Sequence, residues 1–212
     1  SWLAEIARNE LSRHFRMYVF RNAKIHPLHH YVQLFYNDAM TYDPATKTGG
    51  LKANYFDREA TKDPRFKALL GLASDLKCHK ELESEVQYDK LSVSDYLTMA
   101  TLVVLKESNG PDLLMDFVYG RKDAPQKNTG AIPTEANLKA SLQGKGFSDG
   151  EIVAAASIPS FGILVNPEKA NHSIYPKFDN YFFQQVLSAS SATHPFLSDA
   201  ILADPALKEL CE

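Results

Sequence analysis

The stretch Ser92-Val-Ser-Asp-Tyr-Leu-Thr-Met-Ala-Thr-Leu-Val-Val-Leu-Lys-Glu107 decides the fold class of this protein. Ser92, followed three residues later by Asp95, has the form of a capping box that begins a helix. Asn109-Gly110-Pro111 then predicts the end of that helix. Between these signals, apolar residues recur at steps of three and four, which is typical of an amphipathic helix. The predicted apolar face consists of Val93, Tyr96, Leu97, Ala100, Val103 and Val104.

The rest of the chain repeats these helical signals. Apolar spacing predicts helices near residues 11–19, 28–39 and 64–79, and further ones at 134–143, 178–187 and 199–210, the last with a restart at Asp204-Pro205. Ser148 and Glu151 form a second capping-box pattern, and Pro159 should interrupt the helix that follows. Residues 117–119 could pair as a short strand, but no convincing sheet is present. We therefore expect a mainly α fold in one domain over residues 1–212.

Composition excludes several classes of protein. The 212 residues contain 23 basic and 26 acidic side chains, a net charge of -3, which gives no basic surface for nucleic acid or anionic lipid. Cys78 and Cys211 are too far apart in sequence to indicate a disulfide framework or a metal cluster. No apolar run approaches the roughly 18 residues that a membrane-spanning helix needs.

Two groups of side chains are candidates for sites. His26, His29 and His30 resemble metal ligands by spacing, but no Glu or Cys accompanies them, so a solvated helix start is favoured over a metal site. Tyr181, Phe182 and Phe183 could line a cofactor pocket, but core packing is the favoured interpretation. Phosphate-binding loops and hydrolase motifs are absent from the sequence.

Five strings in order along the chain resemble the ascorbate peroxidases, which are class I haem peroxidases. The resemblance implies the helical haem-peroxidase fold in a form shortened at its C-terminus. The resemblance rests on residues 41–50 (Thr-Tyr-Asp-Pro-Ala-Thr-Lys-Thr-Gly-Gly), 91–100 with 110–111 and 116–124, 147–155 (Phe-Ser-Asp-Gly-Glu-Ile-Val-Ala-Ala), 177–183 (Lys-Phe-Asp-Asn-Tyr-Phe-Phe) and 197–205.

The catalytic positions of the family are changed on the distal side. Active relatives present an Arg, an aromatic residue and a His before the 41–50 loop, and the register places Gln33, Tyr36 and Asn37 in these positions. An amide cannot shuttle a proton between the peroxide oxygens as an imidazole does, nor stabilise developing negative charge as a guanidinium does. The resemblance therefore implies that the family's reaction fails here.

The proximal side departs further from the family. Counting from Glu151 places Pro159 where the family supplies its iron-ligating His, and proline offers no imidazole. Asp199 matches the Asp that orients this His in relatives, but without the His it is interpreted as a helix-start residue. We expect no haem, no metal and no catalytic residue, with Gln33, Tyr36, Asn37 and Pro159 as degenerate positions.

Residues 37–50 also resemble the thylakoid-lumen branch of ascorbate peroxidase-like proteins, which has Asn in the distal His position. This resemblance implies a chloroplast thylakoid lumen location and a haem-free subunit at the membrane periphery, partnered with protein subunits of photosystem II. Two alternatives stay open: a redox enzyme with an unconventional ligand such as His172, and a binder of ascorbate or another small molecule. Since an empty haem cavity would be costly, we expect Phe35, Tyr36 and Phe161 to fill it in part.

Overall fold

The computed structural model describes residues 28–53, 91–123, 132–162, 177–188 and 198–211, together with Asn9, Arg13, Arg16 and Met17. In these ranges the only pairing of extended backbone is an isolated antiparallel bridge between Asp43 and Thr48, so the mainly α fold class is confirmed. The predicted helix at 64–79 and most of the predicted first helix lie outside the described residues. The helical elements are α2 (His29–Met40), α5 (Val93–Glu107), η5 (Leu114–Asp116), α6 (Leu138–Gln143), α7 (Asp149–Ser157), η6 (Ile158–Ser160), α8 (Tyr181–Leu187), α9 (Ser198–Leu202) and α10 (Pro205–Glu209).

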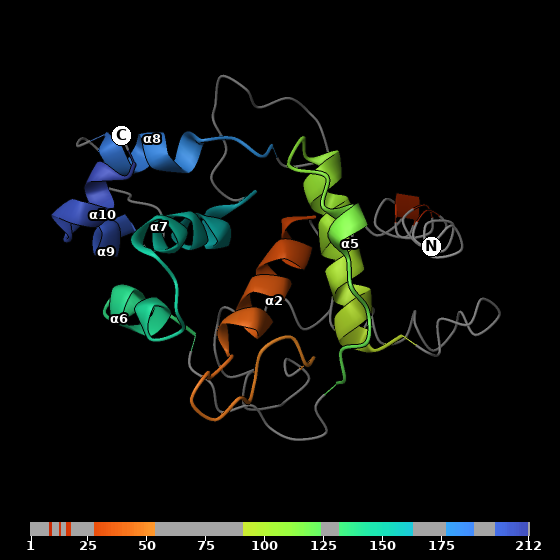
Figure 1. The fold of residues 1–212 in the computed structure, drawn as a ribbon. Helices are drawn as coiled ribbons and strands as arrows, with labels where there is room; N and C mark the ends of the chain where they lie inside the picture. The colour runs from red at the N-terminus through yellow and green to blue at the C-terminus, as the bar shows by residue number, and fades with distance from the viewer. Residues whose placement is uncertain are drawn as a thin grey trace.

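Helix α2 lies between two hydrophobic clusters. On one side it packs along α5, where the Thr101 hydroxyl donates to the carbonyl oxygen of Tyr31 at 3.2 Å. On the other side, Tyr36 and Met40 join a second cluster that contains α6, α7, α8, α9 and α10 (Figure 1). Residues four apart share one face of a helix, so Tyr36 and Met40 together turn toward the second cluster. Helix α2 is thus a wall shared by the two halves of the core.

Helix α5 is buried around most of its circumference. The predicted apolar face is in the core, but Ser94, Asp95, Thr98 and Thr101 are buried as well, which a one-sided amphipathic pattern did not predict. These polar groups are tolerated because they have hydrogen-bond partners. For example, the Thr98 hydroxyl donates to the Ser94 carbonyl oxygen at 2.7 Å. The predictions of a helix and of its apolar face were correct, and the burial of these polar residues was not predicted.

The loop after α5 holds the start of that helix. The Asp123 carboxylate accepts the backbone N–H groups of Val93 at 2.7 Å and Ser94 at 2.9 Å, which are among the unpaired donors of a helix N-terminus. Residues 117–119 form no strand; Phe117 follows η5 in extended backbone and packs its side chain into the α2–α5 cluster. This loop therefore serves as a clamp on α5.

The capping box at Ser148 is present as predicted. The Glu151 carboxylate accepts the backbone N–H of Ser148 at 2.8 Å, and the Ser148 hydroxyl oxygen accepts the N–H of Glu151. Helix α7 then ends at Ser157 and tightens into the 3-10 turn η6, which contains Pro159. The predicted interruption near Pro159 is confirmed. No helix in the described ranges is long and apolar enough to span a bilayer.

Candidate functional site

Two of the four degenerate positions meet directly. The Gln33 side chain on α2 donates a hydrogen bond from Nε2 to the carbonyl oxygen of Pro159 on η6, at 3.0 Å. The two residues are 126 positions apart in the sequence, and α2 and η6 pack against each other at this point. A hydrogen bond of this length leaves no room for another group between the two atoms. The residues that the sequence assigns to the distal and proximal sides are therefore in contact.

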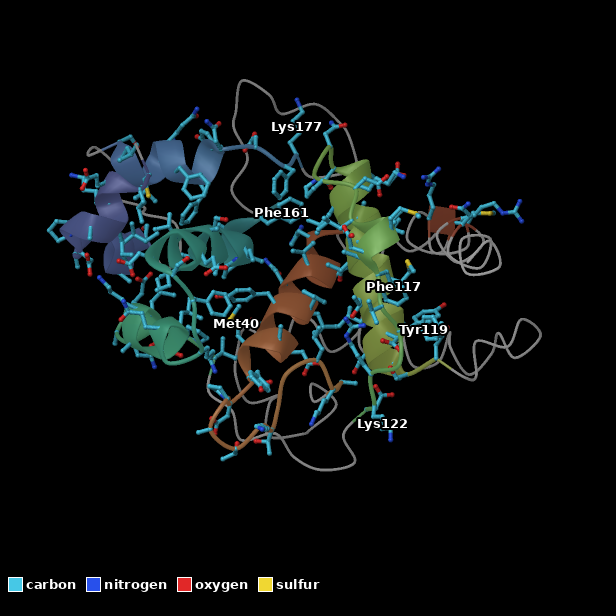
Figure 2. All side chains as sticks on the ribbon, viewed as in Figure 1. Met40, Phe117, Tyr119, Lys122, Phe161 and Lys177 are labelled. Atoms are coloured by element: carbon cyan, nitrogen blue, oxygen red, sulfur yellow. The ribbon has the colours of Figure 1, made fainter. Side chains whose placement is uncertain are left out.

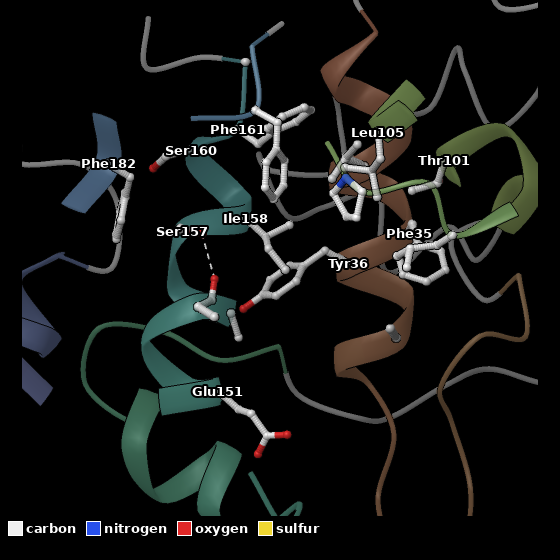
Figure 3. Close-up of a pocket in the computed structure, with 18 of the residues that line it drawn as sticks. Phe35, Tyr36, Thr101, Leu105, Glu151, Ser157, Ile158, Ser160, Phe161 and Phe182 are labelled. Carbon is white, nitrogen blue, oxygen red and sulfur yellow. Dashed lines mark hydrogen bonds between the residues drawn. The ribbon is translucent and has the colours of Figure 1, made fainter. Parts of the chain in front are cut away.

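A cavity of about 640 Å³ lies beside this contact, between α2, α5, α7 and the start of α8 (Figure 3). Of the four degenerate positions, only Tyr36 lines it; Gln33, Asn37 and Pro159 do not. The walls are mostly apolar. Their aromatic members are Phe35, Tyr36, Phe147, Phe161, Phe178, Phe182 and Phe183, and their aliphatic members include Val32, Met40, Leu102, Leu105 and Ile158.

The three bulky side chains expected to fill the haem space in part all line this cavity, but about 640 Å³ stays open. Phe35, Tyr36 and Phe161 do turn toward the cavity, but they form its walls and leave it open (Figure 3). The physical reason is that helices α2, α5 and α7 are each held by other contacts, so their walls cannot collapse inward to fill the void. The residues were identified correctly, and the volume that they leave open was not predicted.

The aromatic residues at the start of α8 take part both in core packing and in lining the cavity, the two roles considered from the sequence. Phe182 is buried in the second cluster, as core packing predicts, and Phe182 and Phe183 also line the cavity. Their rings are 5.3 Å apart and meet at 88°, an edge-to-face arrangement that aromatic pairs favour. Tyr181 does not line the cavity.

Charged groups are confined to three lining residues, Glu151, Lys177 and Asp179. Hydrogen bonds from the backbone N–H and hydroxyl of Ser148 lower the pKa of Glu151. These bonds hold the Glu151 carboxylate at the start of α7. Asp179 accepts the backbone N–H of Tyr181 at 3.0 Å at the start of α8. Lys177 is exposed and forms no ion pair within the described part of the chain (Figure 2).

Asn37 and its neighbour Asp38 are both buried on α2. The Asp38 carboxylate accepts the backbone N–H groups of Lys52 and Ala53, each at 2.9 Å. The Thr41 hydroxyl oxygen accepts the N–H of Gly50 at 3.1 Å, which closes the 41–50 loop. The sequence did not single out Asp38, although its carboxylate fixes the segment that follows the distal helix.

The remaining predicted positions carry no assembled site. Asp199 lies exposed in the first turn of α9, in line with its interpretation as a helix-start residue. His29 and His30 stack edge to face with ring centres 4.6 Å apart, and neither lines the cavity. Among the described residues no three side chains are grouped as metal ligands, while His26 and His172 lie outside those residues.

The pair of histidines predicts a loss of stability in acid. Burial, and secondarily the neighbouring His30, lower the pKa of His29 to about 4 from about 6.5. The unfolded chain therefore binds a proton at His29 before the folded chain does, and stability should fall as the pH drops from 6.5 to 4. Partial exposure reduces the effect, so we expect the His29 contribution to be about 1–2 kcal/mol.

Urea unfolding of wild type and His29→Gln at pH 7.5 and 4.5 measures this contribution. The variant should lose less stability than wild type between the two pH values, since glutamine does not titrate. Equal losses in the two proteins would show that His29 is not the group responsible.

The helical fold is consistent with that of peroxidase-like proteins, and comparison with known proteins shows the family. The sequence profile of the peroxidase family, described as Peroxidase, matches residues 7–212. The chain therefore belongs to the peroxidase family, within the class I haem peroxidase superfamily that includes the ascorbate peroxidases.

Named relatives give the degree of similarity. The chain is 29% identical over 200 residues to L-ascorbate peroxidase 3 of Arabidopsis thaliana, covering 85% of this chain and 64% of that protein. It is 30% identical over 195 residues to the probable peroxisomal L-ascorbate peroxidase 3 of Oryza sativa subsp. japonica, with the same coverage of 85% and 64%. A peroxisomal L-ascorbate peroxidase 5 of Arabidopsis thaliana is 26% identical over 168 residues. The chain thus spans slightly less than two thirds of the length of these first relatives.

The described residues do not fit a haem held in the manner of the family. A haem peroxidase binds iron through a proximal imidazole, but Pro159 has no such nitrogen, and its carbonyl oxygen is already bonded to Gln33. Neither described histidine lines the cavity. The positions that the sequence assigns to the distal Arg and His hold two amides, Gln33 and Asn37, which supply neither a cation nor an acid–base group.

The contact between Gln33 and Pro159 predicts an ordered set of stability losses. Gln33→Met keeps the length of the side chain but removes the donor, and should lower the free energy of unfolding by about 1 kcal/mol. Gln33→Glu should lower it further at pH 7, because a carboxylate would then face the carbonyl oxygen with no proton to donate. Urea unfolding measures both; an unchanged Gln33→Glu protein would mean that the bond does not form in solution.

Proposed function

We propose that this chain is a catalytically inactive, haem-free member of the peroxidase family that serves as a structural or interaction subunit. The direct Gln33–Pro159 contact carries the proposal, because it joins the two positions between which active relatives work. General acid–base catalysis and charge stabilisation both need side chains that these positions lack. Without these catalytic side chains, the fold still provides a stable helical surface.

The proposed setting is the lumenal side of the thylakoid membrane, with protein subunits of photosystem II as partners. This rests on the resemblance of residues 37–50 to the thylakoid-lumen branch of the family. The 41–50 loop is well ordered by its own contacts: Asp43 accepts the backbone N–H of Ala45 at 2.9 Å and the Thr46 hydroxyl at 2.8 Å. A loop of this kind presents a fixed shape to a partner.

The test is an absorption spectrum and an iron analysis of protein purified gently from its native membranes. We expect no Soret band, iron far below one atom per chain, and photosystem II subunits in the same fractions. A Soret band with stoichiometric iron would overturn the inactive, haem-free assignment. Absence of haem together with other partners would overturn the photosystem assignment and keep the structural one.

The cavity favours a second candidate, the binding of a small molecule without turnover. Its mostly apolar walls suit an apolar ligand better than ascorbate, whose hydroxyl groups would lose their hydrogen bonds to water on entering. Calorimetric titration with millimolar ascorbate should therefore give no binding heat. Saturable heat would instead support an ascorbate site.

A further inference from the structure

We propose that the 640 Å³ cavity binds a hydrophobic carboxylic acid, such as a long-chain fatty acid, with its carboxylate at Lys177. This rests on the proposed function only in requiring that haem does not occupy the same space. The cavity lies beside the closed Gln33–Pro159 contact and does not include it. Of the four positions that the sequence identifies as degenerate, only Tyr36 contributes to this site.

The size of the cavity points to a ligand. Protein interiors are packed about as densely as organic crystals, and voids are few and small. Pockets for small molecules, in contrast, enclose roughly 300–1,000 Å³ and are lined mainly by hydrophobic and aromatic side chains. The cavity falls within that range, and its wall is built from rings and aliphatic groups such as Phe161, Leu105 and Ile158 (Figure 3).

The walls are fixed independently of any ligand. Thr101 bonds α5 to α2, Gln33 bonds α2 to η6, and the capping box at Ser148 fixes the start of α7. These contacts join protein groups to one another, so they hold the walls in place without a ligand, although Thr101 and Glu151 also line the cavity. A preformed site of this kind loses little conformational freedom on binding.

The segment 177–179 is also built into the mouth of the cavity. The backbone N–H of Phe178 donates to the carbonyl oxygen of Ser108 at 2.9 Å, at the end of α5. Gly110 permits this approach, since a Cβ there would lie 2.8 Å from the Leu105 carbonyl oxygen and 3.2 Å from the Phe178 ring. Lys177 is therefore held next to the opening by its neighbour.

The charged lining residues are one cation, Lys177, and two carboxylates, Glu151 and Asp179. Glu151 and Asp179 both accept hydrogen bonds at the starts of helices, so their carboxylates are already satisfied in part. Lys177 forms no ion pair with any residue in the described ranges and is the remaining charge for a ligand to meet. One cation next to a mostly apolar cavity matches one carboxylate on a hydrophobic body.

The test is a fluorescence titration of the delipidated full chain with cis-parinaric acid, with oleic acid as the competitor. We expect saturable binding that oleic acid displaces. Lys177→Gln should weaken binding of oleic acid roughly fivefold and leave that of oleyl alcohol unchanged, because only the acid carries the charge. The matched control is Lys122→Gln, another exposed lysine that lies away from the cavity (Figure 2) and should change neither.

A steric variant keeps the proposal testable if the charge contributes little. Ala155→Leu extends a side chain into the cavity and should weaken binding of acid and alcohol alike, with circular dichroism confirming that the variant is folded. Absence of saturable parinarate binding, or equal affinity in Ala155→Leu and wild type, would overturn the site. An equal loss of oleic acid affinity in Lys122→Gln and Lys177→Gln would overturn the role of Lys177. None of these results affects the iron analysis, which tests the proposed function separately.

Discussion

Replacing Asp95 with alanine is expected to lower the free energy of unfolding by about 3 kcal/mol. The Asp95 carboxylate, 2% exposed, accepts the backbone N–H of Gly120 at 2.7 Å and pairs with the Arg121 guanidinium at 2.9 Å. Alanine would leave the partly buried Arg121 without this partner and Gly120 without an acceptor. The 116–123 loop would then lose its bonds to Asp95 and keep only those that Asp123 makes to the start of α5. Urea unfolding at 25 °C measures the loss.

The matched control for this effect is Asp112→Ala. Asp112 also forms a short ion pair, with the Lys106 ammonium at 2.7 Å, but its side chain is 51% exposed. Exposed pairs contribute little because water screens the charges and both side chains lose freedom on pairing. We expect no measurable change from Asp112→Ala, and comparable losses in the two variants would contradict the assignment of Asp95 as a buried clamp.

Asp95 also shows how far local sequence signals reach. The Ser92–Asp95 pattern correctly predicts the start of α5, and the Ser92 hydroxyl oxygen accepts the N–H of Asp95 at 3.0 Å. The predicted reciprocal half of the box is wrong, because the Asp95 carboxylate turns to Gly120 and Arg121. A partner 25 residues away cannot be deduced from spacing. At Ser148 no such competitor is present among the described residues, and both halves of the box form.

Helix limits were predicted less well than helix positions. The helix predicted at 134–143 begins only at Leu138, because Asn137 accepts the backbone N–H of Thr134 at 2.7 Å and holds the preceding residues in a turn. The helix predicted at 178–187 begins at Tyr181, after Asp179 has bonded to its N–H. The break at Asp204-Pro205 is confirmed, with α9 ending at Leu202 and α10 beginning at Pro205. Side chains that bond to nearby backbone explain each late start.

The sequence singled out two residues that the structure joins, but it did not predict how the elements around them pack. Counting along two family strings located Gln33 and Pro159 on facing elements, and the structure places them in contact. The length of that contact, and the fact that the cavity lies beside it, depend on how α2, α5 and α7 are held apart. Spacing within one helix does not contain this information, so the sequence identified Phe35, Tyr36 and Phe161 as residues facing the space but not how much of it they leave open.

Two neighbouring alanines of α7 are expected to respond in opposite directions when each is replaced by leucine. Ala155 is 5% exposed and lines the cavity, whereas Ala156 is 0% exposed and does not line it. Ala155→Leu would place new methyl groups in empty space and should raise the free energy of unfolding by about 1 kcal/mol. Ala156→Leu would force the same groups into packed core and should lower it by about 1–3 kcal/mol.

This pair tests the cavity without any ligand. Helix propensity and the size of the added side chain are the same in both variants, so the difference in stability reports only what each position faces. Urea unfolding of the two proteins under identical conditions should separate them by about 2–4 kcal/mol. If both leucines destabilise the protein equally, the cavity beside Tyr36 is filled in solution. Helices α7 and α2 would then pack together along the cavity as well as at the Gln33–Pro159 contact.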